Sequence, residues 1–430
     1  MKNTVKQNTI YLTALQGFNY VVPLVTVVYL VRIFGPSGYG RVALAQAYIQ
    51  LFSVAIDYGF ALSATRSIAC QTDDIEKVRV VFRAVIFAKL LLALLLLPVM
   101  LLIAWWLPSL RANLLLCCGF YLGVTATALL PSWLYQGFQR MGMLTLITAL
   151  PRIVSTLTIL ALIHRPNQLA AAVLLLAISP GVAAAWALVH CRHWLGLTLG
   201  AVSPARIAEQ LRDGWHVFLA TASGAVYTSS PTLVLGLLAP TAVVGYFAAA
   251  ERVMKAAQNL FTPVTQAVYP YLAQLFQNAR DEALVLLGKL LLLVLIFYGL
   301  VAIVCQLAPA TLLHLILGQR FEPAANILRI LVFYPLLIGI NIITGALYLV
   351  PLNHGRALSR SVAIPTFFHV LLLYPLARFA GAQGVASLLL MTEITILAMR
   401  VHFIARNASK DFVKLWQGLT HPLQPPRNPP

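Results

Sequence analysis

The sequence predicts an all-α integral membrane protein whose helices cross the bilayer many times. The ranges 90–110, 214–250 and 290–319 contain no Asp, Glu, Lys or Arg. A helix on a soluble domain would carry a polar face at helical spacing. These runs are apolar on every side, and each is long enough to cross ~30 Å of hydrocarbon as a helix. Composition agrees, since 60% of the 430 residues are apolar and only 10% are charged.

Twelve segments are expected to form membrane spans. The uncharged range 214–250 is too long for one helix, and Ala239-Pro240-Thr241 supplies the turn that divides it. In chain order the predicted spans are 9–31, 42–63, 84–106, 112–135, 143–163, 168–190, 215–238, 242–270, 284–306, 325–350, 361–378 and 383–404.

The distribution of positive charge predicts the orientation of these spans. Of the 30 Lys and Arg residues, 17 lie in the N-terminus, alternate loops and the C-terminal tail, against six in the other loops. Cytoplasmic loops are enriched in Lys and Arg, so both termini are expected in the cytoplasm. We expect an N-terminal six-helix lobe at 1–190, a cytoplasmic linker at 191–214, a C-terminal six-helix lobe at 215–405, and a Pro-rich, disordered tail at 406–430.

Two pairs of segments indicate an internal repeat. The run 85–92 (VIFAKLLL) returns as 285–292 (VLLGKLLL), and the turn 35–40 resembles the turn 239–245. The offset of about 200 residues spans six helices, so odd helices match odd helices. The two lobes are then related by a pseudo-two-fold axis along the membrane normal. The alternative is a chance match between similar leucine-rich helices.

Charge and cysteine usage exclude several function classes. The net charge is +18, but the basic residues punctuate apolar runs, whereas a nucleic-acid binder gathers them in surface clusters. No nucleic-acid partner is therefore expected. The five cysteines lack metal or CxxC spacing, so we expect small apolar packing residues and neither a metal nor another cofactor.

Ten charged residues fall inside the predicted spans, where charge is costly and commonly functional. The acids are Asp57, Glu251 and Glu393, and the bases are Lys89, Arg152, Arg252, Lys255, Lys289, Arg329 and Arg400. The membrane interior of the chain is therefore net basic. Lys89 and Lys289 lie near predicted span ends, and their stems are expected to snorkel toward the interface.

Glu251-Arg252-x-x-Lys255 is the strongest candidate anion site. Glu251 and Lys255 stand at i and i+4 and can pair, while Arg252 shares a face with Lys255. One positive charge is left over, which suits a phosphate group. The alternative is an ion-pair network that only docks this helix. Arg152 and Arg329 are further candidates for phosphate contact, each with a structural alternative.

The remaining candidates are acids and aromatic rings. Asp57 and Glu393 could bind a coupling proton or Na⁺, or could form structural hydrogen bonds. Glu251 could belong to that coupling site or only to its ion pair. Sugar rings stack on aromatic side chains, and the candidates for such contacts are Trp133, Tyr135, Tyr227 and Tyr246. The alternative for these rings is interfacial anchoring or packing.

Motifs along nearly the whole chain carry a family resemblance. They are Arg32-Ile33-Phe34-Gly35-Pro36-x-x-Tyr39-Gly40, Asp57-Tyr58-Gly59-Phe60, Thr65-Arg66, Pro131-Ser132-Trp133-Leu134-Tyr135-Gln136-Gly137, Tyr246-x-x-Ala249-Ala250-Glu251-Arg252, Tyr269-Pro270, Ile327-Leu328-Arg329-Ile330-Leu331 and Gly381-x-x-Gly384. The sequence resembles the O-antigen and exopolysaccharide flippases, the Wzx-type polysaccharide transporters. These share a superfamily and a MATE-like fold with the multidrug and toxic-compound extruders and the lipid II flippases.

The resemblance implies transport of an undecaprenyl-pyrophosphate-linked glycan from the cytoplasmic to the periplasmic leaflet of the bacterial inner membrane. It also implies a polysaccharide polymerase and a chain-length regulator as partners. Two alternatives stay open. A multidrug/cation antiporter of the same superfamily would need uncompensated acids, but three intramembrane acids face seven bases. A membrane polymerase or acyltransferase would need catalytic groups on a sizeable loop, and the nine histidines form no HxxxxD or HExxH pattern.

Overall fold

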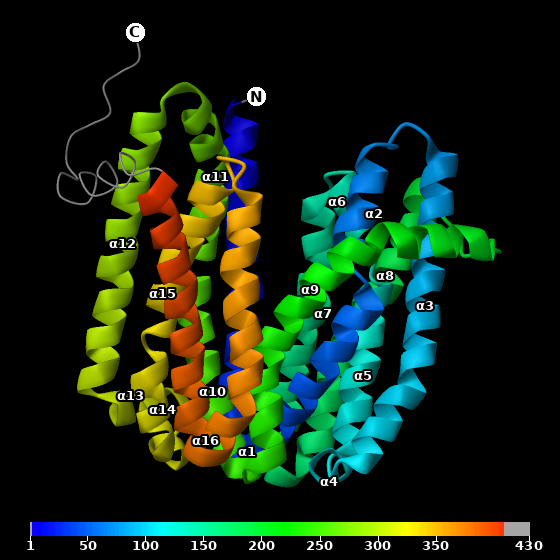
Figure 1. Cartoon of the computed structure of the whole chain (residues 1–430). Helices are drawn as coiled ribbons and strands as arrows, with labels where there is room; N and C mark the ends of the chain where they lie inside the picture. The colour runs from blue at the N-terminus through cyan, green and yellow to red at the C-terminus, as the bar shows by residue number, and fades with distance from the viewer. Residues whose placement is uncertain (1, 408–430) are drawn as a thin grey trace. The chain divides into compact units, whose positions relative to one another are not determined.

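The computed structural model describes residues 2–407, with side chains for Val22 and for 24–407 except 220, 262, 263, 266 and 267. These residues form helices and connecting turns, with no strand among them. The elements in chain order (Figure 1) are α1 (Lys2–Asp57), α2 (Phe60–Ala69), α3 (Ile75–Trp106), α4 (Pro108–Arg111), α5 (Leu114–Leu129), α6 (Ser132–Gly137), α7 (Met141–Leu162), η1 (Pro166–Gln168), α8 (Leu169–Leu195), α9 (Pro204–Leu238), α10 (Thr241–Asn259), α11 (Thr262–Asn278), α12 (Arg280–Leu307), α13 (Pro309–Leu317), η2 (Gln319–Ala324), α14 (Ala325–Leu331), α15 (Tyr334–Ile342), the π-helix η3 (Ile343–Leu349) and α16 (Gly355–Asn407).

The chain divides into two compact units, unit 1 at Met1–Gly245 and unit 2 from Tyr246 onward. Unit 1 includes α9, which packs on α1, α2 and α3. The lobes and the linker expected at 191–214 stay predictions. The part of the predicted tail beyond Asn407 lies outside the described residues.

Eight helical stretches in the described chain are long and apolar enough to cross a membrane, which makes this a multi-pass membrane protein. Two of them, 24–69 and 355–407, each contain a break at a glycine with positive φ, Gly35 at 64° and Gly381 at 57°. Glycine adopts this conformation without the Cβ clash that other residues meet. The break at Gly35 falls between the spans predicted at 9–31 and 42–63, and the break at Gly381 falls between those predicted at 361–378 and 383–404. Helices α9, α10 and α11 coincide with the spans predicted at 215–238 and 242–270 but are not among the eight, and the count of twelve stays a prediction.

Local sequence explains several helix boundaries outside the apolar stretches. Asp74 caps the N-terminus of α3, where its carboxylate accepts a hydrogen bond of 3.1 Å from the main-chain N–H of Lys77. The Lys77 ammonium also lies 3.0 Å from that carboxylate. These two contacts, the side-chain one foremost, hold the pKa of Asp74 below its ordinary value. At its other end α8 stops at Gly196, whose φ of 61° provides a left-handed C-cap.

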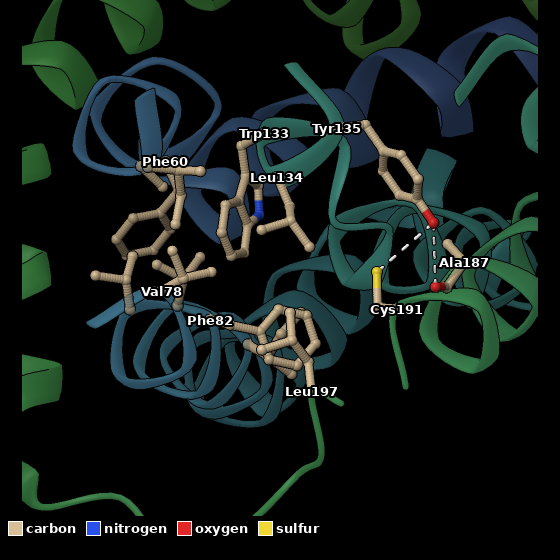
Figure 2. Packing of buried hydrophobic residues seen from close by; sticks show 14 of the residues in the cluster. Phe60, Val78, Phe82, Trp133, Leu134, Tyr135, Ala187, Cys191 and Leu197 are labelled. Atoms are coloured by element: carbon tan, nitrogen blue, oxygen red, sulfur yellow. Dashed lines mark hydrogen bonds between the residues drawn. The ribbon is translucent and has the colours of Figure 1, made fainter. Parts of the chain in front are cut away.

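The core of unit 1 gathers side chains from α2, α3, α6, α7 and α8 (Figure 2). Trp133 packs on Phe82 with ring centroids 6.1 Å apart. The Tyr135 hydroxyl donates to the carbonyl oxygen of Ala187 at 3.3 Å. Apolar side chains gain little by leaving lipid, so close packing and such hydrogen bonds hold helices together in a membrane.

Polar side chains also connect helices of unit 1 outside this cluster. The hydroxyls of Thr26 in α1 and Thr156 in α7 lie 2.8 Å apart, and the Ser155 hydroxyl donates to the carbonyl of Leu175 in α8 at 2.8 Å. The Tyr48 hydroxyl donates to the carbonyl of Met100 in α3 at 2.7 Å. Each polar group thereby finds a partner inside the bundle, where no bulk water is available.

The tightest backbone approach in unit 1 joins the turns at 35–40 and 239–245, whose sequences resemble each other. A Cβ atom added to Gly40 would lie 1.8 Å from the carbonyl oxygen of Thr241, and one added to Gly245 would lie 2.0 Å from the carbonyl oxygen of Pro36. The contact is reciprocal, because the glycine of the first turn (Gly40) approaches Thr241 of the second turn, while the glycine of the second turn (Gly245) approaches Pro36 of the first. Two copies of a motif make such a contact across a two-fold axis. The symmetry of the complete lobes stays a prediction.

Unit 2 has its own core, built from α11, α12, η3 and α16. Leu284 and Leu287 of α12 are fully buried in it, together with Leu349 of η3. The hydroxyl of Tyr298 donates to the carbonyl of Gln258 at 3.1 Å, which ties α12 to the end of α10.

The cysteines were predicted to be small packing residues, and most of them are. Cys117, Cys191 and Cys305 are buried and form no disulfide, while Cys70 is exposed.

Candidate functional site

The predicted anion site lies on α10, in the part of that helix that belongs to unit 2. Glu251 and Lys255 form an ion pair of 2.8 Å, with side-chain exposures of 12% and 35%. The i, i+4 pairing inferred from the sequence is therefore confirmed. Arg252, half-buried, makes no hydrogen bond or ion pair with the described residues. Its positive charge is left uncompensated beside a pair that neutralises itself.

The other two candidate phosphate ligands occupy different places. Arg152 is exposed on α7 in unit 1, next to the buried Pro151. Arg329 is exposed on α14 in unit 2, where its carbonyl accepts a hydrogen bond of 2.8 Å from the Gln306 side chain. Their roles in phosphate contact stay predictions.

Asp57 ends α1 and pairs with Lys89 of α3 over 2.7 Å. The Lys89 side chain is only 2% exposed, and its ammonium lies 5.9 Å from the ring centre of Phe60. The prediction that Lys89 snorkels to the interface is therefore wrong. Its stem is held between helices of unit 1, and its charge is balanced there by the carboxylate of Asp57. The two residues are 32 positions apart, so their spacing in the sequence did not predict this pair.

A break in the helical path places Asp57 at this position. Tyr58 and Gly59 have φ values of 50° and 77°, so α1 stops and α2 restarts beyond them. The ring of Tyr58 stacks on Phe218 of α9 with centroids 4.7 Å apart. A Cβ added to Gly59 would lie 2.7 Å from a methyl carbon of Val217. Discontinuous helices in transporters commonly place their half-helix ends and unwound main-chain carbonyls at substrate and ion sites.

Removing one member of the Asp57–Lys89 pair should destabilise the protein more than removing both. Asp57→Asn leaves a buried ammonium without its carboxylate, which costs roughly 3 kcal/mol. Asp57→Asn combined with Lys89→Met removes both charges and is expected to recover most of that loss. Thermal unfolding of the purified protein in detergent measures both variants and completes a double-mutant cycle with Lys89→Met. Additive effects of the two substitutions would show that the pair contributes no coupling energy.

Glu393 is buried in α16 at 5% exposure. The side-chain amide of Asn341 in α15 donates to its Oε2 at 2.8 Å. Glu393 was expected either to bind a coupling ion or to form structural hydrogen bonds. The structure shows such a hydrogen bond, and the binding of a coupling ion stays a prediction.

The four candidate sugar platforms differ in accessibility. Trp133 and Tyr135 are fully buried in the core of unit 1 (Figure 2), so a sugar contact with either finds no support in this conformation. Tyr227 on α9 and Tyr246 on α10 are half-buried. Tyr246 meets Phe321 edge to face, with centroids 6.1 Å apart and planes at 90°. Contacts of these two rings with sugar stay predictions.

The partners of the intramembrane charges at Lys89, Glu393 and Arg400 were not predictable from the sequence. Asn341 and Ser361 surround Arg400, which is 6% exposed, and both residues read as ordinary polar interruptions of apolar helices. A polar residue in a span that is otherwise apolar is a usable signal, because it needs a partner in the bundle. Which partner it finds depends on packing. Among the described residues, no three His, Cys, Asp or Glu side chains are grouped to hold a metal ion.

A model of the polysaccharide biosynthesis protein family matches residues 5–276, which is more than half of the chain. The chain belongs to this family. Two curated proteins named "Putative O-antigen transporter" match it over nearly their full lengths. The Escherichia coli K12 protein is 29% identical over 94% of this chain and 98% of its own, and the Shigella dysenteriae protein is 27% identical over 91% and 98%. Both are named as transporters, which places this family member with transport proteins rather than enzymes.

Solved structures show the fold that this member of the polysaccharide biosynthesis family adopts. The lipid II flippase MurJ in an inward closed conformation matches with a TM-score of 0.72 at 13% identity, over 96% of this chain and 91% of its own. A MATE family multidrug resistance transporter in an inward-facing conformation matches with a TM-score of 0.63 at 17% identity, over 90% and 95%. The expected MATE-like fold is confirmed.

Proposed function

We propose that the chain is a flippase for an undecaprenyl-pyrophosphate-linked oligosaccharide, the repeat unit of an O-antigen or exopolysaccharide. It moves this substrate from the cytoplasmic to the periplasmic leaflet of the bacterial inner membrane. Family membership and the two relatives named for O-antigen transport support the substrate class. The excess of Lys and Arg in alternate loops supports an orientation with both termini in the cytoplasm.

The observation that carries the proposal is the uncompensated Arg252 on α10. A pyrophosphate that leaves water loses hydration and counterions, and a guanidinium replaces them with short, charge-assisted hydrogen bonds. Glu251 already neutralises Lys255 at 2.8 Å, so the arginine provides the net positive charge of this site. Arg152 and Arg329 are exposed and are proposed to contact phosphate at other stages of transport.

The energetics of the lipid carrier fit a transporter that handles only the head group. The polyprenyl chain is as apolar as lipid and stays in the bilayer, so the protein has to shield the charged pyrophosphate and the polar glycan. Alternating access would expose that head group first to one face of the membrane and then to the other, with a proton or Na⁺ as coupling ion. A polysaccharide polymerase and a chain-length regulator would receive the product in the periplasm.

Complementation tests this function directly. In a strain that lacks its own flippase, expression of this chain is expected to restore the long-chain polysaccharide ladder on gels of surface glycolipid. An empty vector gives the baseline. The same cells are challenged with cationic drugs, because an antiporter would raise resistance without restoring the ladder. Increased drug resistance with no ladder, in strains that cover several glycan structures, would refute the flippase assignment.

A further inference from the structure

Unit 2 buries a polar network that joins α15 to both halves of α16. Its members are Asn341, Ser361, Glu393 and Arg400, with exposures of 6%, 3%, 5% and 6%. We call these four residues the Glu393 network. None of the four belongs to the Arg252 site that is proposed to bind the pyrophosphate.

One residue of the network touches both of its charges. The Asn341 side chain donates to Glu393 Oε2 at 2.8 Å, while the Asn341 carbonyl oxygen accepts from Arg400 Nη1 at 2.5 Å. Arg400 Nε in turn donates to the Ser361 hydroxyl at 3.0 Å. Glu393 therefore contacts the side chain of Asn341, while Arg400 contacts its main chain and, at 3.5 Å, its side-chain oxygen.

Asn341 stands where the helix changes type. The α-helix α15 ends at Ile342 and the π-helix η3 begins at Ile343. The change from α to π hydrogen bonding disturbs the main-chain ladder at the junction, and π segments recur at functional sites. Arg400 and the hydroxyl of Thr344 both donate to the Asn341 carbonyl here.

Gly345 makes the approach of Arg400 possible. A Cβ atom at Gly345 would lie 2.7 Å from Arg400 Nη1 and 2.9 Å from its guanidinium carbon. Any larger residue would push the guanidinium away from η3. The π-helix η3 and the position of the Arg400 guanidinium therefore depend on each other at Gly345.

Among the described residues, Glu393 is the only acidic residue whose side chain is buried. An ionised carboxylate is costly inside a membrane protein unless a cation compensates it, and Arg400 provides that charge in the same network. Protonation of Glu393 would remove the negative charge and leave Arg400 without compensation. The two protonation states therefore favour different arrangements around Asn341.

The donors around Glu393 favour a proton over a metal cation as ligand. A metal ion needs several oxygen ligands. Here Asn341 turns its NH₂ group toward the carboxylate, and the nearby guanidinium repels a second cation. A proton needs only one carboxylate oxygen.

We propose that Glu393 is a proton-binding site and that Asn341 and Arg400 transmit its protonation state to the α15–η3 junction. The step is the addition of one proton to the carboxylate, with no other bond made or broken. Its role in driving the glycan across the membrane rests on the proposed flippase function, but proton binding itself does not.

Other titratable or charged groups lie on the elements that pack against α16. Those to be separated from Glu393 are the buried Arg400 and His369 on α16, the buried Tyr334 on α15 and Tyr348 on η3, and the exposed Arg329 on α14. His369 is the one of these whose ordinary pKa lies nearest the neutral range. It bonds the hydroxyl of Thr392 at 2.9 Å, so a variant of His369 belongs in the test.

The experiment uses the purified full chain in lipid nanodiscs, without substrate, across a series of pH values. Infrared difference spectra report protonated carboxylic acids, and hydrogen exchange reports the α15–η3 junction. In the wild type, a carboxylic acid band is expected to appear on acidification, together with at least a tenfold change in amide exchange near Asn341. Exposed acids contribute to the band as well, so absence of the change in amide exchange in the wild type overturns the proposal without any variant.

Glu393→Gln keeps the shape of the side chain and removes the titrating group. It is expected to remove the component of the carboxylic acid band that is due to Glu393, together with the pH dependence of junction exchange, while His369→Gln retains both. Glu322→Gln, at an exposed glutamate of η2, is the matched control and should keep both the Glu393 component of the band and the wild-type pH dependence of junction exchange. An unchanged pH response in Glu393→Gln would overturn the assignment. Failure of the complementation test would refute the flippase function and leave these outcomes unaffected.

Discussion

Replacing Arg252 with alanine is expected to abolish surface polysaccharide in the complemented strain while the amount of protein in the membrane stays normal. The substitution removes the one positive charge on α10 that Glu251 does not neutralise. Loss of a charge-assisted contact to phosphate costs about 2 kcal/mol, or roughly thirtyfold in affinity. Because entry of the pyrophosphate into the site would depend on this contact, transport should fall with the affinity. The polysaccharide ladder, quantified against membrane protein by immunoblot, measures the effect.

Two further variants make this result specific. Arg252→Lys keeps the charge but loses the paired donors of the guanidinium, so it should retain part of the activity. Arg320→Ala removes an exposed arginine of η2 in the same unit and should leave the ladder intact. A normal ladder in Arg252→Ala would remove this residue from the substrate path. An equal loss in Arg320→Ala would instead indicate a general effect of net charge.

Gly40→Ala is expected to cause the largest loss of stability from a single added methyl group. The new Cβ would lie 1.8 Å from the carbonyl oxygen of Thr241, a main-chain atom that cannot turn aside as a side chain can. The α1 and α10 backbones would have to separate, and overpacking of this kind costs about 1–3 kcal/mol or more. Gly245→Ala should behave alike, because its Cβ would lie 2.0 Å from the carbonyl oxygen of Pro36.

The control for these substitutions is Gly224→Ala, at a helical glycine in α9 that has no neighbouring atom within 4 Å of the added Cβ. It should leave the unfolding temperature unchanged or raise it slightly, since alanine favours the helical state. Thermal unfolding of the three purified variants in one detergent gives the comparison. Equal unfolding temperatures for Gly40→Ala and Gly224→Ala would show that α1 and α10 do not depend on this approach.

Several features followed from the sequence because they depend on composition and local spacing. Apolar runs without charge have only the bilayer to face, so the helical membrane fold and most of the spans could be read from them. The pairing of Glu251 with Lys255 was predictable for the same reason, since four residues of helix bring two side chains together whatever the helix packs against. The turns at 35–40 and 239–245 resemble each other in sequence, and the structure brings them into reciprocal contact.

The environments of other candidate residues could not be predicted from composition and local spacing. Lys89 lies where a snorkelling stem would reach the interface, yet it is buried against Asp57, 32 residues earlier in the chain. The rings of Trp133 and Tyr135 carry the chemistry of sugar platforms, but they fill the core of unit 1. In each case the residue type permits two environments, and the choice depends on which helix face a neighbour covers.

The amino-acid sequence by itself determined that this protein lies in a membrane, that its backbone is helical and that its spans carry an excess of positive charge. Hydropathy and charge are properties of the individual residues and do not depend on the fold. Only the tertiary structure decided which of those charges are satisfied. It joined Asp57 to Lys89 and Glu393 through Asn341 to Arg400, and it left Arg252 without a partner among the described residues. Compensation of charge depends on distance between atoms, and helices far apart in sequence acquire that distance only by packing.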